Sequence, residues 1–252
     1  MTLRRTVTIL APAYNEAENI EGSVRDAVEA AAGLDDFEII VVDDGSTDGT
    51  GEIIDRLTDE IPQLRAIHHG RNLGIGAAYR TALEHARMEY FAWTAGDREL
   101  HRDSLRDILD AVGSAAIVIP YHGTPERREF HRRVLTLIST TQLNLMFGLR
   151  LHYYQGPAIY PTQLARALPM TSTGFYFATE RLVHALLAGH SWVQVPLRYQ
   201  NRTYGRSKAV SVPNVFKAEW VIWRLWWRVR VRGKLAIPRV TAPANTVLEG
   251  AE

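Results

Sequence analysis

The decapeptide VVDDGSTDGT, residues Val41–Thr50, decides the fold of this chain. Four apolar residues, Ile39–Val42, lead directly into two adjacent carboxylates, Asp43 and Asp44, and a glycine-containing turn follows. Two interpretations compete. The stretch is either an ordinary strand-to-helix turn with a capping aspartate, or the end of a strand that delivers its carboxylates to a ligand at the edge of a sheet.

Strand and helix patterns alternate on both sides of this stretch. Such alternation predicts an α/β fold with a mostly parallel, doubly wound sheet, and the nearly continuous apolar strands agree because both faces of such a sheet are covered. We expect strands at 6–11, 37–42, 64–68, 90–94, 115–120 and 192–199, and helices at 16–32, 50–60, 75–87, 104–112, 126–147, 172–187 and 213–234. Because parallel strands end at one edge of the sheet, Asp43, Asp44 and Asp97 should share that edge.

Composition limits the classes of protein that the chain can belong to. Its 252 residues are 46% hydrophobic and 23% charged, which is an ordinary globular profile for one large α/β domain or two small ones. The formal net charge of +1 gives no bias toward nucleic acid, and we expect no nucleic-acid partner. The absence of cysteine excludes disulfides, thiol nucleophiles and Cys-ligated zinc.

Targeting and membrane-spanning signals are also missing from the sequence. The apolar run near the N-terminus is too short for a signal peptide and is better interpreted as the first strand. No stretch of about 18 uncharged apolar residues is present, so any membrane contact should be peripheral.

Three common nucleotide and metal motifs do not match. The sequence has no G-x-x-x-x-G-K-[ST] segment, and GIGAAY (Gly74–Tyr79) places Tyr79 at the third glycine of G-x-G-x-x-G. The acidic spacing of DDGSTDG does not fit an EF-hand loop.

Four segments that each follow a predicted strand match another pattern. They are APAYNEAENI (Ala11–Ile20), VVDDGSTDGT (Val41–Thr50), RNLGIGAAYRTAL (Arg71–Leu83) and TAGDREL (Thr94–Leu100). In this order and spacing they resemble the family 2 glycosyltransferases of the GT-A fold, and more closely the dolichyl- and polyprenyl-phosphate sugar transferases. The resemblance extends over residues 7–208 and implies a GT-A domain over residues 1–212.

The resemblance implies a nucleoside site at the ends of the first two strands. Carboxylates can accept hydrogen bonds from base N–H groups and ribose hydroxyls. The residues that match the family's nucleoside-binding positions are Pro12, Ala13, Tyr14, Glu16 and Asp43, and we add Asp44 beside them. We interpret Asp48 as a turn or helix cap. Arg71, Asn72, Gly74 and Gly76 either shape a loop beside the site or serve packing alone.

A metal site is implied at TAGDREL, with one departure from the family. The family's D-x-D pair holds a divalent cation against the donor diphosphate, but here Ala95 replaces the first aspartate. Asp97 matches the second aspartate, and Glu99 supplies another carboxylate. These hard oxygen ligands suit Mg²⁺ or Mn²⁺, and the alternative is weak metal binding or an inactive enzyme.

A second departure concerns the sugar. In LRLHYYQGPAIY (Leu149–Tyr160), Tyr153 and Tyr154 stand where many relatives carry an aspartate. This argues against the best-known mannosyl and glucosyl members and leaves the sugar open.

The segment that ends in RTYGRSK (Arg202–Lys208) resembles the family's R-x-x-Y-G-x-S-K. A diphosphate leaving group and a phosphate acceptor need several cationic and hydroxyl donors, which Arg202, Arg206, Ser207 and Lys208 could supply. The resemblance implies catalytic roles for Asp97, Arg202 and Lys208; a solvated basic loop is the alternative. Glu180 either orients this loop through an ion pair or faces solvent.

The segment 213–234 predicts an amphipathic helix. At 100° per residue, Phe216, Trp220, Trp223 and Trp227 fall on one face and three basic residues fall on the other. This pattern is typical of a helix that lies in a membrane surface, and core packing and a dimer interface are the alternatives. We expect residues 235–252 to form a disordered tail.

Together these features predict an inverting glycosyltransferase that moves a sugar from a GDP- or UDP-linked donor to a polyprenyl phosphate. We expect it in the cytoplasm, peripheral on the inner face of the membrane. A transferase for another lipid or glycan acceptor and a non-catalytic nucleotide-sugar-binding protein are the alternatives. The sequence leaves the oligomeric state open.

Overall fold

The computed structural model describes residues 4–94, 100–123, 130–171, 174, 176–198, 212–233, 237 and 246–247. The side chains of 130–132 and 212–218 lie outside this description, as do those of 246–247.

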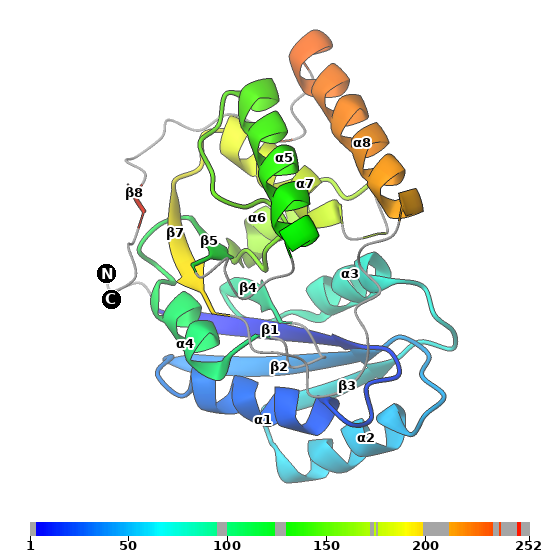
Figure 1. Cartoon of the computed structure of the whole chain (residues 1–252). Helices are drawn as coiled ribbons and strands as arrows, with labels where there is room; N and C mark the ends of the chain where they lie inside the picture. Colours follow the sequence, from blue (N-terminus) through cyan, green and yellow to red (C-terminus); the bar gives the residue numbers. More distant parts are fainter. Residues whose placement is uncertain are drawn as a thin grey trace.

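A five-stranded sheet organises the first half of the chain (Figure 1). Its order is β3-β2-β1-β4-β6, with the first four strands parallel and β6 antiparallel to β4. The strands are β1 (Thr6–Ala13), β2 (Asp36–Asp43), β3 (Leu64–His68), β4 (Tyr90–Trp93) and β6 (Tyr160–Pro161). The connecting helices are α1 (Ile20–Ala31), α2 (Thr50–Glu60) and α3 (Ile75–His85). The predicted α/β class with a mostly parallel sheet is confirmed.

The strands bury both of their faces, as their continuous apolar runs predict. Along β2, Ile39 and Val41 join the core under α1 and α2, whereas Ile40 and Val42 join the core on the opposite face with α3. Successive strand side chains point to opposite faces, so one run of apolar residues serves two cores.

The fifth predicted strand lies in a second sheet instead of extending the first. β5 (Ile117–His122) pairs in parallel with β7 (Trp192–Leu197), which pairs with β8 (Thr246–Val247). The short antiparallel strand β6, which the sequence analysis does not predict, pairs with β4. An isolated bridge joins Val118 of β5 to Ile159, the residue before β6. β8 falls within the segment 235–252 that we expect to be a tail.

The remaining helices cover the sheets and form one end of the molecule. They are α4 (Arg102–Asp110), α5 (Phe130–Phe147), α6 (Thr162–Ala167), α7 (Phe177–Leu187) and α8 (Val212–Trp226), which continues into the π-helical turn η2 (Trp227–Val231). In Figure 1, α5 and α8 lie at the end away from α1 and α2. Every residue from Phe177 to Leu186 of α7 is buried.

Three of the tryptophans of α8 and η2 do not pack in the core. Trp220, Trp223 and Trp227 are each more than half exposed, whereas Ile222 and Leu225 are buried. The core-packing alternative is therefore wrong for these three tryptophans.

Candidate active site

The first two predicted motifs meet at the carboxyl edge of the sheet. Ala13 is the register partner of Asp43, and the backbone N–H of Asp44 donates to the carbonyl of Ala13 over 2.8 Å. Asn15, whose φ of 54° is tolerated by asparagine, donates its backbone N–H to Ser46 Oγ at 2.9 Å and accepts from the Thr47 N–H at 2.9 Å. The segments expected to hold a nucleoside thus form one hydrogen-bonded edge.

Gly45 brings a third segment against this edge. Its φ is +76°, and a Cβ atom there would lie 2.5 Å from the carbonyl carbon of Arg71. Only glycine fits both the left-handed backbone and this close approach. The loop at Arg71 and Asn72 therefore lies directly beside the DDGS turn, as one of the two interpretations of that loop predicts.

Asp44 ties the same loop to β2. The residue is buried, and its carboxylate accepts from the backbone N–H groups of Leu73 at 2.9 Å and Gly74 at 2.7 Å. His69 Nδ1 lies 2.7 Å from Asp44 Oδ1. Three donors from the chain therefore already surround the carboxylate of Asp44, and its predicted contact with nucleotide stays a prediction.

Asp43 has fewer donors from the chain. Its Oδ1 accepts from the Ser46 N–H at 3.0 Å, and His68 Nδ1 lies 3.1 Å from Oδ2. An ionised carboxylate offers about four acceptor positions, so Asp43 keeps capacity for further donors. Burial of the Asp43–Asp44 pair does not by itself indicate a ligand, because the chain supplies partners to both.

Asp48 has the local role that the sequence predicts. It accepts from the Thr50 N–H at 3.1 Å and the Thr50 hydroxyl at 2.5 Å, at the start of α2, and from the Ala17 N–H at 3.2 Å. Burial acts to raise the pKa of Asp48, but these hydrogen bonds outweigh it and lower the pKa. The turn interpretation of Asp48 is confirmed, whereas the N-cap position of α2 is occupied by Gly49.

The other predicted nucleoside residues lie on the same edge. Pro12 and Ala13 end β1, and Tyr14 is partly exposed just beyond it. Glu16 accepts from Asn19 Nδ2 at 2.8 Å, and its backbone N–H donates to Thr50 Oγ1 at 2.9 Å. These bonds hold the segment after β1 against the start of α2.

The predicted metal and phosphate residues lie outside the described residues: Ala95, Asp97, Glu99, Arg202, Arg206, Ser207 and Lys208. The last described residue before the metal segment is Thr94, whose N–H donates to Leu10 at 2.8 Å, so β4 ends at the same edge as β1. Among the residues that the structure does describe, no group of three or more His, Cys, Asp or Glu could hold a metal ion. The chemistry of the Asp97 and Glu99 donors, two hard carboxylates, fits Mg²⁺ or Mn²⁺.

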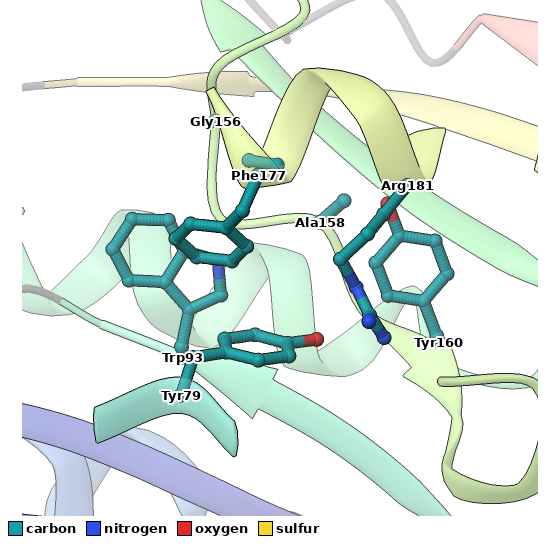
Figure 2. Close-up of a pocket in the computed structure, with 8 residues that line it drawn as sticks. Tyr79, Trp93, Gly156, Ala158, Tyr160, Phe177 and Arg181 are labelled. Carbon is teal, nitrogen blue, oxygen red and sulfur yellow. The ribbon is translucent and has the colours of Figure 1, made fainter. Parts of the chain in front are cut away.

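A cluster of aromatic rings around Arg181, which the sequence analysis does not predict, lies beside β4 (Figure 2). The ring of Tyr79 packs 5.0 Å from that of Phe91 and 4.8 Å from that of Phe177, measured between centroids. The buried guanidinium of Arg181 lies 4.8 Å from the Tyr79 ring and donates to the carbonyls of Ala165 at 2.5 Å and Leu168 at 3.2 Å.

The cluster is part of the packed core, because the gap between its side chains is too small for a water molecule. Tyr79 is the residue that interrupts the G-x-G-x-x-G pattern, and its ring fills the core at that point. No local sequence signal marks Arg181, because its partners come from α6 and the turn after it.

Glu180 is buried, so the alternative in which it faces solvent is wrong. Its carboxylate accepts from the Thr171 N–H at 2.9 Å and the Thr171 hydroxyl at 2.8 Å, and Arg228 lies 3.8 Å away. A buried carboxylate requires such partners. The described ion pair joins α7 to η2, and a pair with the loop at 202–208 falls outside the described residues.

The two tyrosines that replace the family's aspartate, Tyr153 and Tyr154, are also buried. The hydroxyl of Tyr154 donates to Asn144 Oδ1 at 2.7 Å, which links this turn to α5.

Comparison with known proteins identifies the family. Residues 8–168 match the model of glycosyl transferase family 2. The chain is 30% identical to glycosyltransferase AglD of Haloferax volcanii, over 96% of the chain but only 40% of that relative's length. It is 28% identical to an undecaprenyl-phosphate mannosyltransferase of Micrococcus luteus (90% of the chain, 98% of the relative). It is 31% identical to a polyprenol monophosphomannose synthase of Mycolicibacterium smegmatis (87% and 88%).

Solved structures agree on the fold. Mannosyl-3-phosphoglycerate synthase of Rubrobacter xylanophilus superposes with a TM-score of 0.67 at 18% identity, over 95% of this chain and 78% of that one. Glucosyl-3-phosphoglycerate synthase of Mycobacterium tuberculosis, solved with Mn²⁺, UDP and glucosyl-3-phosphoglycerate, superposes with a TM-score of 0.63 at 19% identity (93% and 81%). The predicted GT-A fold is confirmed, and the chain belongs to glycosyl transferase family 2.

Proposed function

We propose that this family 2 glycosyltransferase moves a sugar from a GDP- or UDP-linked donor to a polyprenyl phosphate, with inversion at the anomeric carbon. The observation that carries the proposal is the edge at which Ala13 pairs in register with Asp43 and Asn15 forms hydrogen bonds with the turn that follows Asp44. Two relatives that the chain covers almost entirely are named for sugar transfer to polyprenyl phosphates. AglD is more than twice as long as the matched region, so its whole activity is not transferred.

Each part of the proposed site has one task. Asp43, with Pro12, Ala13, Tyr14 and Glu16 around it, accepts hydrogen bonds from the nucleoside. Asp97 and Glu99 hold Mg²⁺ or Mn²⁺, which would stabilise the charge of the leaving diphosphate. The cationic and hydroxyl groups of the segment 202–208 bind the phosphates of donor and acceptor: Arg202, Arg206, Ser207 and Lys208.

The reaction needs no dedicated base on the protein. A phosphate monoester has a second pKa of about 6, so the acceptor is already anionic near neutral pH. Its oxygen forms the new bond to C1 of the sugar, the bond from C1 to the donor diphosphate breaks, and the nucleoside diphosphate leaves with the electron pair. The attack from the opposite side of C1 inverts the configuration.

Thermal unfolding with GDP and UDP, each with and without Mn²⁺, tests the donor site. A ligand at 100 times its Kd adds about 2.7 kcal/mol of stability, which raises the Tm by roughly 5–10 °C for a chain of this size. A metal-dependent shift with one nucleotide supports the proposal and names the donor class. No shift with either nucleotide contradicts it.

Transfer of labelled sugar from GDP-mannose or UDP-glucose to undecaprenyl phosphate tests the acceptor. Asp97→Asn should abolish transfer and leave the Tm of the free protein unchanged, and unchanged turnover would remove Asp97 from the mechanism. Transfer only to other acceptors favours the first alternative, and nucleotide binding without any transfer favours a non-catalytic protein.

We also propose that α5 and α8 attach the enzyme to the inner face of a membrane. On α8 and η2, Trp220, Trp223 and Trp227 are 62%, 56% and 51% exposed, and on α5 Leu137, Ile138 and Leu145 are 67%, 56% and 80% exposed. An exposed set of large apolar side chains on two packed helices is typical of an interaction surface. No helix among the described residues is long and apolar enough to cross a membrane.

Hydrogen bonds join the helices that carry this apolar surface, and a basic side chain lies beside it. Gln142 of α5 donates to Glu219 of α8 at 2.8 Å, and Arg230 donates to the carbonyl of Phe147. The guanidinium of Arg224 lies 5.1 Å from the Trp220 ring, so the prediction that this arginine lies on the other face of the helix is wrong. Arginine beside interfacial tryptophan suits anionic lipid headgroups, which favours a membrane over a second copy of the chain as the occupant.

Sedimentation with vesicles of a zwitterionic lipid, with and without an anionic lipid, tests this surface. Replacing Trp220, Trp223 and Trp227 by alanine together should lower binding to anionic vesicles about tenfold or more. Leu73→Ala, at an exposed leucine away from this surface, is the matched control. Equal binding by wild type and the triple variant contradicts the proposal, and a dimer in solution that the triple variant abolishes favours the dimer alternative.

A further inference from the structure

Two neighbouring histidines at the end of β3 serve the two carboxylates of the DDGS turn. His68 is the register partner of Asp43, with Nδ1 3.1 Å from Asp43 Oδ2 and Nε2 2.9 Å from Asp55 Oδ1 of α2. His69 has Nδ1 2.7 Å from Asp44 Oδ1 and Nε2 3.0 Å from the Thr81 hydroxyl. The sequence analysis assigns neither histidine a role.

The partners of each ring decide how many protons it carries. An ionised carboxylate only accepts, and a neutral imidazole has one N–H, so a ring between two carboxylates makes both bonds only as the imidazolium. This is the case for His68. The Thr81 hydroxyl can donate as well as accept, so the two contacts of His69 do not require the imidazolium.

We propose that His68 is a positioning residue that acts as an imidazolium: it holds the Asp43 carboxylate for the nucleoside and makes nucleotide affinity fall as pH rises. This inference rests on the proposed function, because it takes Asp43 as a nucleoside-binding residue. His68 itself acts through Asp43 and is not a catalytic residue.

The surroundings of Asp43 explain why one donor matters. The carboxylate is buried, and α2 closes over it, since a Cβ on Gly51 would lie 3.2 Å from Asp43 Oδ2 and 3.6 Å from His68 Nδ1. Within the part of the chain that the structure describes, the Ser46 N–H is the other donor to this carboxylate, and it binds the other oxygen. Without the His68 donor, Oδ2 loses its partner in a buried place, which disturbs the orientation of the carboxylate.

The charges near His68 agree with this assignment. The charged groups that the structure places against the ring are Asp43 from β2 and Asp55 from α2. Burial acts to lower the pKa of His68, but the hydrogen bonds and charges of these two carboxylates outweigh it and raise the pKa.

The first experiment follows the ring nitrogens of His68 and His69 by NMR between pH 6 and 9. The pKa of His68 should lie above the ordinary histidine value of about 6.5. Asp55→Asn, which removes one carboxylate and no contact with Asp43, should lower the pH of the His68 transition. A neutral His68 ring throughout this range overturns the proposal.

The second experiment measures the affinity for GDP and UDP calorimetrically at constant Mn²⁺ between pH 6.5 and 8.5. Wild-type affinity should fall as pH rises, relative to two His68 variants. His68→Ala should bind about tenfold more weakly at pH 6.5. His68→Asn keeps an uncharged donor near the position of Nδ1 and should recover part of that loss without the pH dependence.

Comparison between variants removes the contribution of the nucleotide's own titration. His69→Asn is the matched control and should keep the wild-type pH dependence. Wild type and His68→Asn with identical pH profiles overturn this inference and leave the proposed function intact. Failure of the wild type to bind either nucleotide at any pH contradicts the proposed function itself, and this inference with it.

Discussion

In most folded proteins charged side chains are exposed and large apolar side chains are buried. The carboxyl edge of the sheet departs from this pattern in its charged residues, and the outer surface of α5 and α8 departs from it in its apolar residues. At the edge, charged groups are buried, and each described carboxylate there has donors from the chain, as Asp43 and Asp44 show. On α5 and α8, large apolar groups such as Leu145 and Trp220 are exposed. Buried charge needs partners and exposed apolar area tends to acquire them. The buried charges of the first region are thus paired within the fold, with acceptor capacity left at Asp43, whereas the apolar groups of the second region face outward.

The largest expected effect is a loss of stability caused by a substitution in the DDGS turn at the carboxyl edge of the sheet. Gly45→Ala combines a left-handed backbone with a Cβ 2.5 Å from Arg71, and it should cost about 3 kcal/mol or more of unfolding free energy. Gly49→Ala is the control: its φ is also positive, at +92°, but its nearest contact is a side-chain atom at 3.9 Å, so the cost should be about 1 kcal/mol. Urea denaturation measures both, and equal costs would contradict the role assigned to the close approach.

The next effect separates the two sides of α8. Ile222→Ala removes a buried side chain and should destabilise the protein by about 2–4 kcal/mol. Trp223→Ala, one residue away but more than half exposed, should change stability by less than about 1 kcal/mol while weakening binding to anionic vesicles. A large loss of stability for Trp223→Ala would show that the outer surface belongs to the core.

A smaller effect separates the two adjacent aspartates. Asp44→Asn weakens or removes bonds from Leu73, Gly74 and His69, and should cost about 1–3 kcal/mol of unfolding free energy. Asp43→Asn should cost less stability but more affinity for nucleotide. Denaturation and calorimetry on both variants test this, and the reverse ranking would exchange the structural and binding roles of the pair.

The smallest effect concerns pH. The folded-state pKa of His68 is raised, so its contribution to stability is fully present below the unfolded value of about 6.5 and is lost as pH rises through the folded value. The ring is partly exposed, and solvent screening keeps the contribution small. The Tm of the wild type should fall slightly more between pH 6 and 9 than that of His68→Asn, and a rise would contradict the assigned sign.

The sequence predicted the bounds of an element closely where that element is a clearly amphipathic helix or a clearly apolar strand. The helix at 50–60 and the strand at 64–68 have the bounds expected from sequence, whereas the helix expected at 16–32 begins only at Ile20 because a turn onto the Glu16 carbonyl precedes it. A strand was predicted at 115–120 and lies at 117–122, but the sheet to which it belongs was not predicted. Strand periodicity specifies a strand and its buried faces, and it contains no information on which neighbour it pairs with.

The sequence by itself determined the α/β class, the family motifs and the carboxylates at the ends of the strands, because these depend on short-range spacing and on the shared direction of parallel strands. Only the tertiary structure decided that His68 and His69 face Asp43 and Asp44, that Arg181 is buried against Tyr79, and that three tryptophans of α8 and η2 are exposed. Those contacts join residues far apart in the chain. They follow from strand order and helix packing, and no local pattern of the sequence contains either.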